Sequence, residues 1–218
     1  SSLNRAILPN RGFSQSLTLQ TTVPAASDLE FYKLDYRGQH FTPVSKQTAL
    51  RLHTELGYGD GFGDTDGLPF YENYFAGGIS SVRGFRNGSL GPRAVASLAY
   101  PNISSNPSQL PNYDPVTGIF QCNPQTGICT DPDQDDQPFG GNVMITGGVD
   151  YLFPLPFIKD QSSLRTTFFV DVGNVFSTNC DKFTVDCNSP DLGDMAISTG
   201  FGLTWITAMG PLGFAIAT

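Results

Sequence analysis

The stretch LRTTFFVDVGNVF, residues 164–176, decides the fold, because its side chains alternate between two kinds. One row of alternate positions is apolar and consists of Leu164, Phe168, Val170, Val172 and Phe176. The other row holds Arg165, Thr167, Phe169, Asp171 and Gly173. Successive side chains of a β-strand point to opposite faces of its sheet, so this period of two predicts a long strand with an apolar face and a face that carries an acid.

The same period recurs along the chain. It is found in residues 13–23, 31–42, 46–59, 143–153 and 195–206. In residues 143–153 Asp150 lies on the polar side, and in residues 195–206 the row opposite the apolar one is made of small side chains. The pattern predicts an all-β, antiparallel protein.

A soluble sandwich of antiparallel strands also alternates, so the period alone leaves sandwich and membrane barrel open. Three features favour a transmembrane β-barrel. The expected strands have the length that a tilted crossing of an apolar band of about 25 Å needs. Short turns, such as residues 42–45, alternate with long polar loops. Aromatic residues gather near the strand ends, where an interfacial girdle would lie: Tyr58, Phe153, Phe157, Phe176 and Trp205.

Composition and motifs exclude other classes. Charged residues make up 15% of the chain, against roughly 25% in soluble domains, and the net charge of −8 argues against a nucleic-acid partner. No apolar run approaches the roughly 20 residues of a transmembrane helix. The sequence has no nucleophile motif, phosphate loop or metal-ligand spacing, so we expect no enzyme activity, no cofactor and no metal site.

The four cysteines fall into two local pairs, Cys122 with Cys129 and Cys180 with Cys187, each within turn-forming sequence. This spacing predicts two disulfides that close loops in an oxidising compartment. The alternative is four free thiols of a cytosolic protein.

Residues 60–141 form one long connection rich in Gly, Pro, Asn and Asp. Connections of this length are usually functional or disordered. The first half reads LPFYENYFAGGISSVRGFRNGSLGPR over residues 68–93, and its density of aromatic residues and glycines indicates a segment built to pack. The inside of a barrel would suit it.

Several motifs in this chain resemble those of the BamA family. The loop motif is Val82-Arg83-Gly84-Phe85, between Gly77-Gly78 and Gly91-Pro92. Five further motifs occur in order around it: residues 58–61 (YGDG), 69–73 (PFYEN), 140–142 (GGN), 168–173 (FFVDVG) and 209–212 (MGPL).

The resemblance implies that residues 1–218 are the carboxy-terminal portion of a sixteen-stranded barrel, with an extracellular loop, residues 60–141, folded into the lumen. It also implies that POTRA domains and the first strands precede this portion, and that one more strand follows Thr218. The implied function is folding and insertion of β-barrel proteins in the outer membrane of a Gram-negative bacterium. The implied partners are outer-membrane lipids, nascent barrel clients and the assembly lipoproteins of the BAM complex.

Arg83 is the candidate functional side chain, because a guanidinium on a loop folded inward needs a carboxylate partner. The alternation places Asp150 and Asp171 on the lumen side of neighbouring strands, so one guanidinium could bridge both acids. In a wet lumen we expect the bridge to contribute a value in the middle of the range between the ~0–1 kcal/mol of an exposed pair and the ~3–5 kcal/mol lost on breaking a buried one. The alternative is a solvated loop arginine and two acids that merely line the lumen.

Two other functions stay open at this stage. A transporter of the two-partner secretion type carries a similar arginine-glycine-phenylalanine loop, which would gate a pore for one secreted protein. A passive porin-like channel with a constricting loop is the third possibility.

Overall fold

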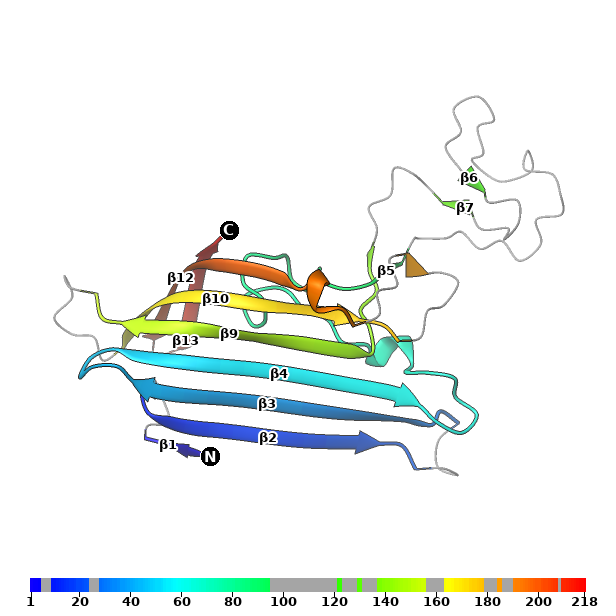
Figure 1. The fold of residues 1–218 in the computed structure, drawn as a ribbon, viewed down its shortest axis with the longest axis horizontal. Coiled ribbons are helices and arrows are strands. Elements are labelled where there is room, and N and C mark those ends of the chain that lie inside the picture. The colour runs from blue at the N-terminus through cyan, green and yellow to red at the C-terminus, as the bar shows by residue number, and fades with distance from the viewer. Residues whose placement is uncertain are drawn as a thin grey trace.

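A computed structural model describes residues 1–4, 9–23, 28–94, 121–122, 129–130, 137–155, 163–178, 184–185, 190–207 and 209–218. One antiparallel sheet of eight strands dominates it (Figure 1). The strands, in sheet order, are β1 (Ser2–Leu3), β2 (Gly12–Thr21), β3 (Phe31–Pro43), β4 (Ala49–Gly61), β9 (Val143–Phe153), β10 (Leu164–Phe176), β12 (Ala196–Thr207) and β13 (Gly210–Ala217). Sheet order follows chain order, so the sheet is a meander whose edges, within the described residues, are β1 and β13.

Small elements complete the fold. A three-stranded sheet joins β5 (Arg93–Ala94), β8 (Gln137–Pro138) and β11 (Thr184–Val185), and β6 (Gln121–Cys122) pairs with β7 (Cys129–Thr130). Two 3₁₀ turns, η1 (Phe70–Glu72) and η3 (Leu192–Asp194), lie in the connections. Across the described ranges, no helix has both the length and the hydropathy to span a bilayer.

The six stretches with period two all form strands of this sheet, with ends shifted by three residues or fewer. The sequence interpretation missed β13, because its apolar row of Leu212, Phe214 and Ile216 is short and because the strand also contains Gly and Pro, which disfavour strands. Eight antiparallel strands with these two faces make an all-β sheet of the barrel type.

The sheet has an apolar outer face that is open to its surroundings. Exposed side chains on this face are Phe13, Leu17, Leu19, Leu34, Leu52, Leu56, Tyr58, Val149, Tyr151, Phe168, Val170, Ile197, Phe201, Trp205, Leu212, Phe214 and Ile216. Water-soluble monomers rarely expose a continuous apolar surface of this extent, whereas the lipid-facing wall of a barrel consists of one. The outer face therefore fits contact with hydrocarbon.

Of the residues expected in the aromatic girdle, Tyr58 and Trp205 are exposed and Phe153 is half-buried, but the expectation is wrong for Phe176, which is 1% exposed. The end of the long connection packs against the carbonyl of Phe176, because a Cβ placed on Gly141 would overlap that oxygen. Phe157 lies outside the described residues.

Long and short connections leave opposite ends of the sheet (Figure 1). Residues 62–142, between β4 and β9, and residues 177–195, between β10 and β12, leave the same end. The turn at residues 44–48 lies at the other end, where β12 also ends and β13 begins. Outer-membrane barrels show this asymmetry of long outer loops and short periplasmic turns.

The inner face is covered by the first part of the long connection. Four of its apolar side chains form a core cluster with Met144 of β9 and Val175 of β10. The four are Tyr74, Ala76, Val82 and Leu90. A smaller cluster of Phe41, Ala49 and Leu152 fills the inner face near the short turns. The long connection thus supplies most of the core that the sheet itself lacks.

We expect Leu17→Arg to destabilise the whole protein in a bilayer, while Thr18→Arg is tolerated. Leu17 lies at the middle of β2 on the outer face, where a cation costs about 2 kcal/mol or more, and Thr18 is the next residue but lies on the inner face opposite Asp35. Urea unfolding in lipid vesicles measures both. Equal losses for the two variants would contradict the assignment of the faces.

Candidate functional site

The candidate site lies on a hairpin-like segment, residues 74–90, that packs on the inner face. We call residues 77–90 the tip of this segment and the part around Tyr74 its base. The Tyr74 N–H donates to the Gly141 carbonyl at 2.8 Å, and the Leu90 N–H donates to the Ala76 carbonyl at 3.0 Å. The tip turns at Gly77, whose φ of +104° is open to glycine and disfavoured for other residues. The same turn needs this glycine for space, because a Cβ there would lie 2.6 Å from the Arg86 carbonyl oxygen.

Arg83 joins both predicted acids. Its Nε and Nη2 donate to the two oxygens of Asp171 at 2.6 and 2.7 Å, and its backbone N–H donates to the same carboxylate at 3.1 Å. Nη2 also donates to Oδ1 of Asp150 at 2.6 Å. One guanidinium therefore connects the tip to β9 and β10 at once; we call this group of three residues the Arg83 clamp.

The aromatic ring of Phe169 packs against the Arg83 guanidinium. The Cζ of Arg83 lies 3.7 Å from the centroid of the Phe169 ring, a cation–π contact, and Phe169 is fully buried. The far end of the ring lies close to Gly200 of β12, because a Cβ there would come within 2.8 Å of Phe169 Cζ. The small inner row of β12 leaves room for the ring. An aromatic residue in the polar row of residues 164–176 was the sequence signal for this role, which the sequence interpretation did not assign.

Two side chains of β4 complete the cluster. Arg51 Nη1 donates to Oδ2 of Asp150 at 3.0 Å. The ring of His53 lies between the acids, with Nδ1 3.7 Å from Asp150 Oδ2 and Nε2 3.8 Å from Asp171 Oδ1. Two arginines thus face two carboxylates, so these four charges balance.

The burial of the acids sets the energy scale of the Arg83 clamp. Asp150 is 1% exposed and Asp171 is fully buried. Removing one partner of a buried pair leaves an uncompensated charge and typically costs about 3–5 kcal/mol. The clamp therefore belongs at the upper end of the expected range rather than in its middle.

The other residues of the loop motif have packing roles. Val82 is fully buried in the core cluster, and Phe85 packs against that cluster. Gly84 has a φ of +98°, and a Cβ there would lie 3.0 Å from Cβ of Ala217 in β13. The tip therefore reaches from β9 to the last strand of the described sheet.

The cysteines are only partly placed. Cys122 and Cys129 are directly opposite in the backbone register of β6 and β7. Their side chains, and Cys180 and Cys187 altogether, lie outside the described residues. The two disulfides stay predictions.

The described ranges contain no group of three or more His, Cys, Asp or Glu side chains that could hold a metal ion. A polar cavity of about 300 Å³ lies beside the cluster on the inner face, between β2, β3, β4 and the tip. Ser14 and Ser16 of β2 and Ser80 and Ser81 of the tip are among the residues lining it. This lining suits water.

Comparison with known proteins gives consistent relatives. The family described as the Omp85 superfamily domain matches residues 1–218. The outer membrane protein assembly factor BamA of Neisseria meningitidis serogroup B is 27% identical over 232 residues, which cover 97% of this chain and 24% of that protein. The crystal structure of BamA from Haemophilus ducreyi lacking POTRA domains 1–3 superposes with a TM-score of 0.74 at 27% identity and covers 100% of this chain and 37% of that one. The chain thus spans well under half the length of these relatives.

We expect Asp171→Asn to open the tip more than Asp150→Asn does. Asp171 accepts three bonds from Arg83 and Asp150 accepts one, so neutralising Asp171 should cost about 3 kcal/mol of tip stability. Rates of proteolysis within residues 77–90 of the folded whole protein give this free energy. Equal opening of the tip by both variants would contradict the conclusion that Asp171 holds Arg83 more strongly than Asp150 does.

We expect Gly200→Ala to disturb the site and Gly202→Ala to leave it unchanged. A Cβ at Gly200 would overlap the Ile216 carbonyl and press on the Phe169 ring, whereas the nearest atoms around Gly202 lie at 3.7 Å or more. Such overpacking typically costs about 1–3 kcal/mol. The temperature at which the barrel loses its heat-modifiable gel mobility measures both variants, and a harmless Gly200→Ala would refute the packing of Phe169 against β12.

Proposed function

The chain belongs to the Omp85 superfamily, and from this premise we propose that it forms part of the barrel of an assembly factor that folds and inserts β-barrel proteins into the outer membrane. Its location is the outer membrane of a Gram-negative bacterium. The proposed partners are the surrounding lipids, nascent barrel clients and the lipoproteins of a BAM complex.

The observation that carries this proposal is the Arg83 clamp. A loop arginine bonded to two buried strand acids fixes residues 77–90 against the wall formed by β9 and β10. The similarity to the Neisseria assembly factor, which covers 97% of this chain and 24% of that protein, makes a role in assembly the best-supported use of such a brace.

The physical task of an assembly factor fits such a brace. A strand that enters hydrocarbon with unpaired N–H and C=O groups loses several kcal/mol for each group, so insertion is slow unless a partner edge satisfies them. A barrel that opens one part of its wall to offer an edge must keep the rest of the wall in shape. We propose that the clamped tip does this by tying β9 and β10 together from inside.

We propose that the process needs no cofactor, nucleotide or covalent catalysis by this chain. Burial of the client's apolar outer face in lipid supplies the free energy, and the factor lowers the barrier. In this sense the protein is not an enzyme.

We expect Arg83→Ala in the whole protein to lower the level of folded porins, with Arg86→Ala as the matched control. Arg86 is an exposed arginine three residues further along the same tip, so its loss removes a charge without touching the clamp. Each variant replaces the depleted native protein in cells, and folded porins are quantified on semi-native gels.

The proposed assembly role, the transporter and the passive channel predict different results in this experiment. A general fall of folded porins, both on depletion and with Arg83→Ala, supports an assembly factor. Normal porins with one secreted protein trapped in the periplasm would overturn the proposal in favour of a dedicated transporter. A large, steady ion conductance with normal porins would instead indicate a passive channel.

A further inference from the structure

The base of residues 74–90 is held by a second charged contact, far along the sheet from the Arg83 clamp. Lys33 of β3 points from the inner face toward η1. Its Nζ donates to the Glu72 backbone carbonyl at 2.7 Å and lies 3.1 Å from Glu72 Oε2. The same ammonium sits 4.6 Å from the centroid of the Tyr74 ring.

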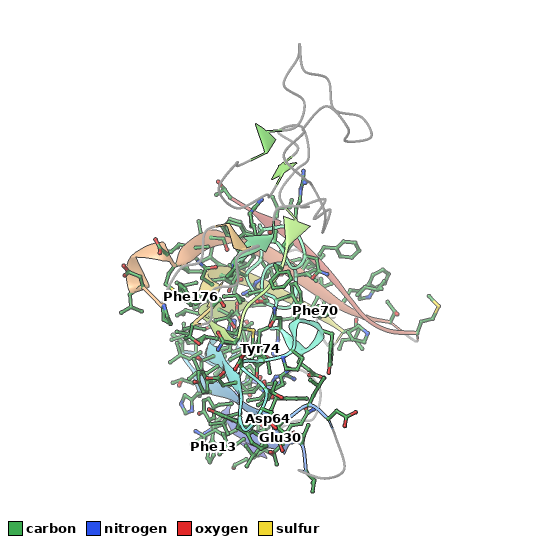
Figure 2. The ribbon with its side chains drawn as sticks, turned by 90° about the vertical axis from the view of Figure 1, so that its right-hand side faces the viewer. Phe13, Glu30, Asp64, Phe70, Tyr74 and Phe176 are labelled. Carbon is green, nitrogen blue, oxygen red and sulfur yellow. The ribbon has the colours of Figure 1, made fainter. Side chains whose placement is uncertain are left out.

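Lys33 and Tyr74 are well enclosed, and Glu72 is partly buried. The side chain of Lys33 is 14% exposed, and Tyr74 belongs to the core cluster. Figure 2 looks onto the end of the sheet where the long connections leave; there Phe70 lies toward the rim and Tyr74 lies further in. A lysine this enclosed must use its donors, and here a carbonyl, a carboxylate and an aromatic face satisfy them.

Tyr74 also rests on the neighbouring strand. A Cβ placed on Gly57 of β4 would come within 2.6 Å of Tyr74 Cε1, so the ring lies directly on the backbone of that strand. Burial raises the pKa of Tyr74, and the nearby Asp35 adds to this, so the phenol stays neutral as a partner for a cation. The base is therefore fixed to β3 and β4, whereas the Arg83 clamp fixes the tip to β9 and β10.

We infer that Lys33, Glu72 and Tyr74 form a second latch, which positions the base of the loop independently of the Arg83 clamp. We call these three residues the Lys33 latch. With both in place the loop is a cross-brace that spans the inner face from β3 to β10. Opening the Lys33 latch frees the base and leaves the tip seated. Only the consequence for client assembly rests on the proposed function; the latch itself is a property of this chain.

Hydrogen exchange of backbone amides separates the two attachments. The amides of Tyr74 and Gly141, which bond to each other's carbonyls, report on the base. The amides of Gly78, Arg83 and Leu90 report on the tip. The measurement uses the purified whole protein in detergent, folded according to its gel mobility, and needs no client. A negative result in this measurement would overturn the Lys33 inference without bearing on the assembly proposal.

We expect Lys33→Met to speed exchange at the base about tenfold, as loss of one hydrogen bond to a charged group would, and to leave the tip unchanged. Arg83→Lys should give the reverse pattern. Lys33→Arg retains a cation and should keep most of the protection. Glu72→Gln retains the backbone carbonyl and the ring contact, so its effect should be smaller, and it serves if Lys33→Met fails to fold.

Arg37→Met is the matched control. Arg37 lies on the same strand and the same face, but its guanidinium pairs with Glu55 of β4 and is largely exposed. No change at the base with either Lys33→Met or Glu72→Gln would overturn the inference. So would identical exchange patterns for Lys33→Met and Arg83→Lys, because the loop would then open as one unit.

Discussion

Two carboxylates buried side by side within the wall of a sheet are the constraint on which the rest of the structure depends. Asp150 and Asp171 lie on adjacent strands with almost no access to solvent. Like charges at such a place repel and lose their hydration, so they are stable only with cations brought to them. Arg51 supplies one cation from β4, and Arg83 supplies the other from a distant loop. The path of the long connection across the inner face follows from this need.

The two faces of the sheet have different roles. The outer face consists of exposed apolar side chains that match hydrocarbon, and it contributes no internal core. The inner face has only small side chains along the middle of β12 and the facing part of β13, where Gly200, Gly202 and Ala215 leave space. The core is therefore built between the sheet and the loop, by Tyr74, Val82 and Leu90 on one side and Met144 and Val175 on the other. A loop that provides the core cannot be a passive surface segment.

Much of this could be predicted from the sequence, because a period of two fixes which face a side chain occupies. This period placed Asp150 and Asp171 on the inner face, and the single arginine of the loop motif was the expected cation for the two carboxylates. It could not bring Arg51 and His53 to the acids, because that depends on the register between β4 and β9, which are separated by the whole long connection. Phe176 was misplaced for a related reason: period two says nothing of which loop covers the end of a strand. β13 was missed because its alternating row is short.

The distance along the chain between the partners of the Arg83 clamp has a consequence for folding. Arg83 precedes Asp150 by 67 residues and Asp171 by 88. Closing so long a loop is entropically costly until β9 and β10 have paired. We therefore expect the clamp to form late in folding. A seated tip marks a wall whose strands are already in register, and a chain with slipped strands leaves the arginine without its acids.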